Sequence, residues 1–473
     1  MTGAASPGGS RGLLLRDVEV DGRRADVRVD GDRVAAVGVR LSPAGTDDVL
    51  DAEGAALLPG LVDHHLHLFA LAATSRSVSC GPPGVRDAAT LAEALRTAPG
   101  DRHGWVRGTG YHESVAGPLD SAALDRLHAA RPIRVQHRSG ALWMLNSAAV
   151  TRIDLAGSPH PGVERHHDGS PTGRVWRADA WLRTRLPRDA PAHLADVGAR
   201  LARFGITAVT DATPDLDETA IAALGDAART GALPQHVHLL GAPLDAELPE
   251  GLTAGPYKIV LADSGLPGLD ELTDRIRAAR DAHRAVAVHC VTREALVLLL
   301  AALDDAGHRP GDRVEHAALV PPELLGELRR RGLRVVTQPG FLADRGDDYV
   351  RDVPTIDHPD LYRCRSLRDA GVPLALSSDA PYGPLDPWAV MAAAVHRRTP
   401  GGARVGPGER LRPAEALDAY LAGPADPGGA PRRIRPGAPA DLVLLDRPLA
   451  EALAAPRADH VREVIIEGRR IPR

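Results

Sequence analysis

Eight short apolar segments, most of them followed or preceded by a helical pattern, constrain the fold of this chain more than any other feature. Alternating strand and helix signals are typical of a parallel sheet, because a chain that returns to lay a parallel strand needs a crossover. We predict strands at 57–63, 206–210, 236–240, 257–261, 285–289, 313–316, 334–338 and 372–377. Helical periodicity is found at 191–204, 269–283, 293–306, 322–331 and 360–370. The fold class is therefore α/β, and eight strands favour a (β/α)8 TIM barrel.

The two ends of the chain have a different pattern. Residues 12–57 alternate apolar and polar side chains around an Asp30-Gly31 hairpin signal, and residues 440–446 and 463–469 also look like strands. We predict a small β-sandwich domain built from 1–57 plus 427–473, and a barrel over 58–426. A large insertion at 68–190, with its own strand at 132–137, follows the first strand and is expected to roof the active site, since the loops after barrel strands build it.

Charge and composition exclude several classes of function. The chain of 473 residues carries 57 basic and 62 acidic side chains, a net charge of −5, which gives no attraction to nucleic acid or an anionic membrane. Apolar runs are too short for a spanning helix, residues 1–9 show no apolar signal segment, and three cysteines do not make a disulfide framework. We expect a cytoplasmic enzyme with a small-molecule substrate, no nucleic-acid partner and no membrane association.

The strongest chemical signal is a His-x-His pair. His65 and His67 end the first predicted strand, and side chains two apart on a strand share a face, so both rings could hold one divalent metal ion. A second such pair, His236 and His238, opens a strand instead. Residues at that end of a barrel strand usually serve stability, so we interpret the second pair as structural.

Four more residues lie near strand ends, at spacings that match whole β/α units. Lys258, His289, His316 and Asp379 are 31, 27 and 63 residues apart in succession, which corresponds to one, one and two units of about 30 residues each. This register predicts their positions on strands four, five, six and eight. It agrees with the strands assigned above from hydrophobic patterning.

Lys258 is the only lysine among the 57 basic residues. Arginine is never deprotonated, whereas a buried lysine can become a neutral amine and react with carbon dioxide to give a carbamate. We therefore predict two divalent metal ions: one held by His65, His67 and Asp379, the other by His289 and His316, with N6-carboxylated Lys258 as the bridge. A metal-bound hydroxide would attack a carbonyl, and Asp379 would act as general base and acid.

These stretches resemble the amidohydrolase superfamily, and most closely its amidohydrolase-3 or YtcJ-like branch. The matching stretches are LPGLVDHHLH at 58–67, WMLNSAA at 143–149, GITAVTD at 205–211, YKI at 257–259, VAVH at 286–289, RVEHA at 313–317, LSSDAP at 376–381 and PGAPADLV at 436–443. The resemblance implies zinc-type metals, a bridging Lys258, and hydrolysis of amide-like C–N bonds. Members are commonly dimers or larger, which leaves a homodimer open.

Three hypotheses about function follow from these residues. The favoured hypothesis is a metal-dependent hydrolase that cleaves the C–N bond of an amide, formamide or cyclic amide. The alternative is a single-metal aminohydrolase acting on a heterocycle, in which Lys258 would pair with a carboxylate. Relatives of that type carry Glu three residues after the strand-five histidine. This chain has Thr292 at that position, which argues against the alternative. The last alternative, an inactive scaffold, conflicts with the six filled ligand positions.

Candidate substrate contacts are few. Tyr111, Arg138, Trp143 and Asn146 lie in the insertion, and Tyr382 follows Asp379; for Asn146 a helix-cap role is an equal alternative. The polar stretch 341–359 lacks a pattern and is predicted to be an irregular lid. Glu315 precedes a ligand on its strand, so it should point away from that ligand and act as a supporting partner.

Overall fold

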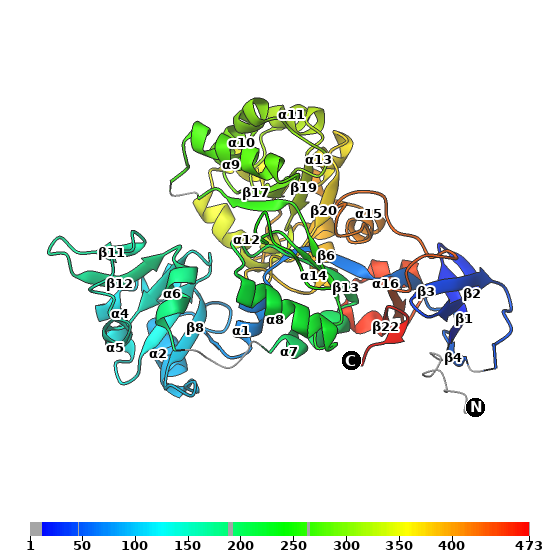
Figure 1. Cartoon of the computed structure of the whole chain (residues 1–473), viewed down its shortest axis with the longest axis horizontal. Helices are drawn as coiled ribbons and strands as arrows, with labels where there is room; N and C mark the ends of the chain where they lie inside the picture. The colour runs from blue at the N-terminus through cyan, green and yellow to red at the C-terminus, as the bar shows by residue number, and fades with distance from the viewer. Residues whose placement is uncertain (1–11, 46, 188–192, 263–264, 473) are drawn as a thin grey trace, which may run out of the picture. The chain divides into compact units, whose positions relative to one another are not determined.

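The computed structural model describes residues 12–45, 47–187, 193–262 and 265–472. The chain divides into two compact units, Met1–Leu68 with Leu194–Arg473 (unit 1) and Phe69–His193 (unit 2). Unit 1 contains parallel sheets flanked by helices, which makes the fold α/β as predicted (Figure 1). No helix in the described part of the chain is both long and apolar enough to cross a bilayer.

Two parallel sheets form the centre of unit 1. The first, in the order β15-β14-β13-β6, contains β6 (Leu61–Leu66), β13 (Ile206–Asp211), β14 (His236–Leu239) and β15 (Leu252–Ala254). The second, in chain order, contains β16 (Tyr257–Val260), β17 (Val286–Cys290), β18 (Arg313–His316), β19 (Arg334–Thr337) and β20 (Leu374–Leu376). Seven of the eight predicted strands are present within a few residues of the expected bounds, because near-continuous apolar runs mark buried parallel strands. The strand predicted at 57–63 is the exception.

Backbone hydrogen bonds connect the two sheets on both sides. On one side, the N–H of Lys258 on β16 donates to the carbonyl of Leu240, the residue after β14, at 3.0 Å. On the other side, the Asp379 N–H donates to the His65 carbonyl at 2.8 Å, and the His67 N–H donates to the Ala380 carbonyl at 2.8 Å. The end of β6 is thereby fixed to the segment that follows β20.

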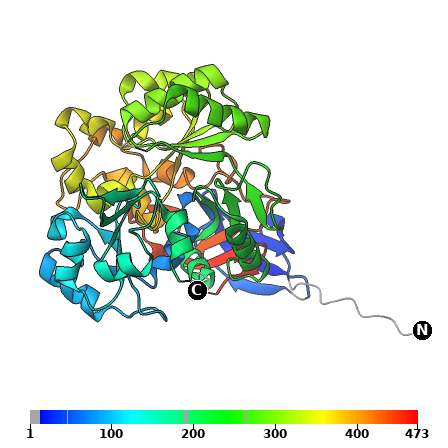
Figure 2. The same cartoon turned by 60° about the vertical axis from the view of Figure 1, so that its left-hand side comes forward.

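Helices follow β13 and each strand from β16 to β20, whereas β14, β15 and β16 succeed one another without a helix. The helices α9, α10 and α11 cover one side of the second sheet (Figures 1 and 2). The helices are α7 (Leu194–Arg203), α8 (Glu218–Arg229), α9 (Leu269–Asp281), α10 (Arg293–Ala306), η1 (Pro322–Leu324), α11 (Leu325–Arg330), α12 (Gly340–Asp352), η2 (Thr355–Asp360), α13 (Arg365–Asp369), α14 (Pro387–His396), η3 (Pro407–Glu409) and α15 (Pro413–Asp418). The predicted helix 293–306 has the bounds observed for α10. Its apolar stripe is buried against the sheet at Leu296, Leu299 and Leu303.

The prediction of an irregular lid at 341–359 is wrong. This stretch forms α12 and η2. The helix has a non-helical residue at Arg345, where φ is −137° and ψ is 21°. Only Phe341 and Leu342 among its buried residues are large and apolar, the others being Gly340 and Gly346, so no continuous apolar stripe is visible in the sequence.

Strands from both ends of the chain lie side by side in unit 1 (Figure 1). One sheet, ordered β3-β2-β1-β4, contains β1 (Leu13–Val20), β2 (Arg23–Asp30), β3 (Arg33–Gly38) and β4 (Asp48–Asp51). The other, ordered β23-β22-β21-β5, contains β5 (Leu57–Pro59), β21 (Leu442–Leu445), β22 (Val461–Ile466) and β23 (Arg469–Arg470), with α16 (Leu449–Ala454) and η4 (Ala458–His460) between its strands. One core joins the two sheets, with Leu15 and Val27 from the first and Leu442 and Ile465 from the second.

The single strand predicted at 57–63 is two strands. β5 pairs with β21 in the terminal sheet, while β6 pairs with β13 in the central one. Gly60 separates them, and a Cβ atom added there would lie 2.1 Å from Thr207 Oγ1. Only glycine allows the chain to pass so close to β13 at this transition.

Unit 2 has its own sheet and core. The mixed sheet, ordered β11-β12-β10-β9-β8-β7, contains β7 (Val78–Ser79), β8 (Val106–Tyr111), β9 (Ile133–His137), β10 (Leu142–Leu145), β11 (Val163–Arg165) and β12 (Pro171–Trp176). Its helices are α1 (Leu68–Thr74), α2 (Ala88–Thr97), α3 (Glu113–Ala116), α4 (Ser121–Leu127), α5 (Ser147–Arg152) and α6 (Asp179–Arg185). The strand predicted at 132–137 corresponds to β9. That the insertion roofs the site stays a prediction.

Candidate metal centre

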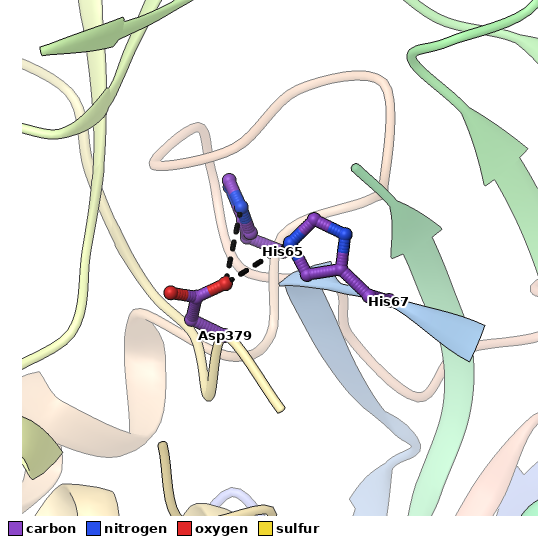
Figure 3. Close-up of side chains that lie close together, drawn as sticks. All are labelled: His65, His67 and Asp379. Carbon is purple, nitrogen blue, oxygen red and sulfur yellow. Dashed lines mark ion pairs between the residues drawn. The ribbon is translucent and has the colours of Figure 1, made fainter. Parts of the chain in front are cut away.

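A histidine pair and a carboxylate meet at the carboxyl ends of β6 and β20. His65 lies on β6, His67 directly follows it, and Asp379 follows β20. Asp379 Oδ1 lies 3.2 Å from His67 Nε2 and 3.5 Å from His65 Nε2 (Figure 3). The potential ligand atoms of the three residues all lie within 4.8 Å of one another. The predicted strand-end triad is thus assembled.

Two atoms of this triad lack the partner that burial demands. His65 Nε2 and Asp379 Oδ1 are buried, and neither makes a hydrogen bond within the described part of the chain. Buried polar atoms in folded proteins are nearly always paired, because an unpaired one costs about 1–3 kcal/mol. An imidazole nitrogen and a carboxylate oxygen are both ligands of zinc. The donor set and its unpaired atoms therefore fit a divalent metal ion.

Burial keeps two of the histidines, His65 and His316, in the neutral form that binds metals. Burial lowers the pKa of His65 well below its usual value, and the nearby positive charge of Lys258 lowers it further. Burial also lowers the pKa of His316 well below the usual value, with smaller contributions from His289 and His65. A metal ligand must be a neutral imidazole, so both rings are ready to coordinate without losing a proton.

His316 and His289 join the cluster through ring contacts. The His316 ring centroid is 4.7 Å from that of His65 and 4.5 Å from that of His289. His316 has φ +69° and Ala317 has φ +45°, values that are uncommon for residues other than glycine. This left-handed turn ends β18 and interrupts the regular alternation of side chains. Residues held this way are frequent at functional sites.

Each of three rings has its Nδ1 atom engaged by a different side chain. The pairs are His65 with Glu315, His67 with Thr213, and His316 with Gln338. The Thr213 Oγ1 distance is 3.3 Å and the Gln338 Oε1 distance is 2.9 Å. Histidine ligands of metals are commonly oriented through the second ring nitrogen in this way, which leaves Nε2 for the metal.

Glu315 supports His65. We predicted that it points away from its neighbour His316 and acts as a supporting partner. Its Oε2 atom accepts from His65 Nδ1, which joins β18 to β6. The sequence indicated the supporting role, and the structure identifies the ring that it supports.

Lys258 lies on β16 and is buried, with 4% of its surface exposed. Burial lowers its pKa from the usual lysine range, against the opposing charges of Glu315 and Asp379. A lysine with a lowered pKa is more readily a neutral amine, which carbamate formation requires. Its charge acts on His65 and His316, so the structure places it near both.

Tyr382, the candidate substrate contact that belongs to unit 1, lies beside the triad. Its ring meets the His67 ring edge-on, with centroids 5.3 Å apart and planes at 73°. The Arg345 guanidinium donates to the Tyr382 carbonyl and lies over the Phe341 ring, 4.3 Å from its centroid. The loop after β20 thus contributes Asp379 and an aromatic side wall.

The candidates in unit 2 have partners within that unit. The Tyr111 hydroxyl donates to the Gly117 carbonyl in the unit 2 core, with the ring fully buried. Asn146 Oδ1 accepts from the Ala149 N–H at 3.0 Å and caps α5, the alternative role considered above. Both side chains are accounted for by the packing of their own unit.

Trp143 and Arg138 also belong to unit 2. Trp143 is 4% exposed, and its Nε1 atom donates to Asp179 Oδ1 at 2.8 Å. The ring lies between two guanidinium groups, 5.2 Å from Arg107 and 5.3 Å from Arg134. Arg138 is half-buried, directly after β9. Their substrate contacts stay a prediction.

Several residues near the triad were not identified from the sequence. Asp63 is fully buried, burial raises its pKa to about 7, and its Oδ1 atom accepts from the backbone of His65 at 3.1 Å and of Ser378 at 3.2 Å. It thereby ties the ligand strand to the Asp379 loop. The period-two spacing Asp63, His65, His67 was the available signal. The partners Thr213 and Gln338 had no such signal, since only the fold brings them to the rings.

The second His-x-His pair makes the structural contacts expected of it. His236 Nε2 lies 3.0 Å from Asp441 Oδ2, and His238 Nδ1 lies 2.8 Å from Thr253 Oγ1. His236 begins β14, at the end of the sheet away from the triad. Asp441 directly precedes β21, so this pair links the central and terminal sheets of unit 1.

Comparison with known proteins agrees with this geometry. The chain is 28% identical to an N-substituted formamide deformylase of Arthrobacter pascens, over 89% of this chain and 90% of that protein. It is 25% identical to the putative amidohydrolase YtcJ of Bacillus subtilis, over 80% of each. An uncharacterised metal-dependent hydrolase of Pyrococcus horikoshii has the same fold, with a TM-score of 0.76 at 20% identity, covering 95% of this chain and 100% of that one. The amidohydrolase family matches residues 48–472. The chain therefore belongs to the amidohydrolase family and is a hydrolase.

Proposed function

We propose that this protein is a metal-dependent hydrolase that cleaves the C–N bond of a small-molecule amide, formamide or cyclic amide. The observation that carries this proposal is the triad of His65, His67 and Asp379. Its donor atoms converge within 4.8 Å, and two of them are buried without a hydrogen-bond partner. Such an arrangement is costly in the absence of a cation and is stabilised by one.

His65, His67 and Asp379 would hold the first ion, and His289 and His316 the second, with N6-carboxylated Lys258 between them. We propose zinc, which takes nitrogen and oxygen ligands of this kind. When bound, such ions lower the pKa of water and polarise a carbonyl group. The buried Lys258, with its lowered pKa, is the residue suited to carbamate formation.

Asp379 is the residue that would move the proton. Its carboxylate lies between the two histidine rings and is almost buried, at 6% exposed. It would accept a proton from the attacking water and return it to the nitrogen of the leaving amine as the C–N bond breaks. The hydrogen bond from its backbone N–H to the His65 carbonyl holds the carboxylate in place.

A formamide is the substrate class that we place first. The relative from Arthrobacter pascens acts on N-substituted formamides and matches nine-tenths of this chain. Tyr382 packs on His67 and would line the space beside the scissile bond. Its ring would favour an apolar substituent over a charged one.

We further infer the finer architecture of unit 1. The eight parallel strands β6, β13, β14 and β16–β20 would form one closed (β/α)8 barrel, supported by the hydrogen bonds from Lys258 to Leu240 and from Asp379 to His65. The two terminal sheets, which share one core, would form the small β-sandwich.

Metal content and a substrate screen test the proposal. The protein, purified after growth with added zinc, should contain about two zinc ions per chain by elemental analysis, as expected of a two-metal hydrolase site. It should release formate from N-alkyl and N-benzyl formamides, while a His65→Ala/His67→Ala variant should lose both metal and turnover. One ion per chain with ammonia release from a heterocycle would instead favour the aminohydrolase. No metal after reconstitution would favour an inactive scaffold.

A further inference from the structure

His65 is oriented by a buried ion pair, that of Glu315 with Arg313. Glu315 Oε2 accepts from His65 Nδ1, while Glu315 Oε1 accepts from Arg313 Nε. None of the three side chains is more than 1% exposed. The other two oriented rings, His67 and His316, have uncharged partners. His65 is therefore distinguished by a charged support.

The pair spans the interior of unit 1. Arg313 and Glu315 are two residues apart on β18, so their side chains share a face of the strand. The second Arg313 contact is with β6, where its Nη2 atom donates to the His64 carbonyl at 2.9 Å. β6 and β18 are not hydrogen-bonded neighbours in either sheet. Arg313 thus fixes the ligand strand and the supporting carboxylate at the same time.

The donors and acceptors leave one consistent assignment. An ionised carboxylate has acceptors only, and an arginine has donors only. The Glu315 carboxylate accepts at both oxygens, from Arg313 Nε at Oε1 and from His65 Nδ1 at Oε2, so the His65 Nδ1 atom carries the proton. A neutral imidazole has one N–H, so the Nε2 atom then bears the free lone pair. That atom is the one turned to Asp379 and left without a hydrogen bond.

We propose that Arg313 is a positioning residue of the metal centre. Its Nε atom holds Oε1 of Glu315 and thereby directs Oε2 to His65 Nδ1, which favours the His65 tautomer that presents Nε2 to the metal. The inference rests on the proposed metal-dependent function. Arg313 itself touches neither metal nor substrate and acts through Glu315.

The test is a pair of linked substitutions with Zn²⁺ affinity as the readout. In Glu315→Gln, the one amide oxygen is taken by Arg313, so the amide NH₂ faces His65 Nδ1 and favours the tautomer with Nε2–H. Zinc affinity, measured on the full chain by competition with a chromophoric chelator, should fall about 10- to 100-fold. The double variant Glu315→Gln/Arg313→Met lets the amide turn its oxygen to His65. The double variant should bind zinc at least about tenfold more tightly than Glu315→Gln. Two substitutions with independent, additive effects would instead weaken binding further.

Two further variants complete the design. Arg313→Lys keeps a charged donor for Glu315 and should hold zinc within about threefold of the wild type, since the carboxylate stays an acceptor. Arg280→Met is the control: it breaks another arginine–carboxylate pair, Arg280 Nη2 to Asp312 Oδ2 at 2.6 Å, in which Asp312 is buried and directly precedes β18. It should lower the thermal midpoint and leave zinc affinity unchanged.

The outcomes separate this inference from the proposed function. A wild type that binds no zinc overturns both. A wild type that binds zinc, with Glu315→Gln equally tight or with the double variant no tighter than Glu315→Gln, overturns the positioning role alone. If the double variant does not fold, Arg313→Lys decides: tenfold weaker zinc binding in a folded Arg313→Lys protein also overturns it. The Co²⁺ absorption spectrum of each variant gives a second readout of ligand geometry.

Discussion

The ring of Tyr382 packs edge-on against the imidazole of His67, with centroids 5.3 Å apart and planes at 73°. His67 is also the most exposed member of the triad, with 15% of its side chain accessible. Its Nδ1 partner, Thr213 Oγ1, lies at a long 3.3 Å. The orientation of this ligand therefore depends on the aromatic contact more than that of His65 does.

Removing the Tyr382 ring should loosen His67. Such aromatic pairs contribute about 0.5–1.5 kcal/mol, so Tyr382→Ala should weaken zinc binding by about 2- to 13-fold. Tyr382→Phe keeps the ring and should bind zinc like the wild type. Equal affinity in both variants would show that the contact does not orient the ligand.

Replacing the Asp379 carboxylate should stop turnover without unfolding the chain. Asp379→Asn keeps the volume and the backbone hydrogen bond to His65, but it removes the proton acceptor. Loss of a general acid–base group costs about 10²- to 10⁴-fold in rate, and loss of a metal ligand adds to this. Formate release measures turnover, and circular dichroism shows whether the variant remains folded. A variant that retains activity would remove Asp379 from the proton path.

Lys258 should control how many metal ions are bound. Lys258→Arg retains a positive charge but forms no carbamate, so metal content should fall from about two ions per chain to one or none. Elemental analysis of wild type and variant grown in the same zinc-supplemented medium gives the comparison. Two ions in the arginine variant would exclude a carbamate bridge.

Gly383 offers a test of the Asp379 loop. A Cβ atom at 383 would lie 2.3 Å from the Ser378 carbonyl oxygen and 2.9 Å from the Phe341 ring. Gly383→Ala should therefore displace the segment that carries Asp379, lower stability by about 1–3 kcal/mol and weaken zinc binding. Gly408→Ala is the control, because its added Cβ would meet no atom within 4 Å. Similar zinc affinities in the two variants would contradict the proposed packing of this loop.

The His236–Asp441 pair should make stability depend on pH. The hydrogen bond to Asp441 raises the pKa of His236 above its usual value. Burial alone would raise the pKa of Asp441, but the hydrogen bond and charge of His236, together with the Glu467 N–H and the charge of Arg432, lower it. A raised histidine pKa stabilises the fold below the unfolded value near 6.5, and this contribution disappears as pH rises through the folded pKa.

A thermal-melting series would measure this effect. His236→Gln should melt below the wild type at about pH 5–6, and the two should converge above about pH 8. The difference should stay under about 1 kcal/mol, since the His236 side chain is 41% exposed and solvent screens the pair. A difference that grows toward high pH would contradict the assigned ion pair.

Some features were determined by the sequence alone. Buried parallel strands require runs of apolar residues, and the 30-residue repeat of β/α units places strand ends at regular intervals. Patterning therefore located the strands, and the spacing of His289, His316 and Asp379 placed these residues at or just after the carboxyl ends of strands, whereas Lys258 is the second residue of β16. The carbamate chemistry of Lys258 could also be predicted from the sequence, because it follows from a single lysine among many arginines and needs no knowledge of contact partners.

Other features were decided only by the tertiary structure. The contact of Glu315 with His65 joins residues 250 positions apart, so no local pattern indicates it. The helix over 340–352 was missed because Phe341 and Leu342 are the only large apolar side chains among its buried residues. The chain passes from the terminal sheet to the central sheet at Gly60, where Thr207 leaves no room for a side chain. Local patterns report which residues are apolar and how they repeat, whereas the partner of a buried polar group is chosen by packing between distant segments.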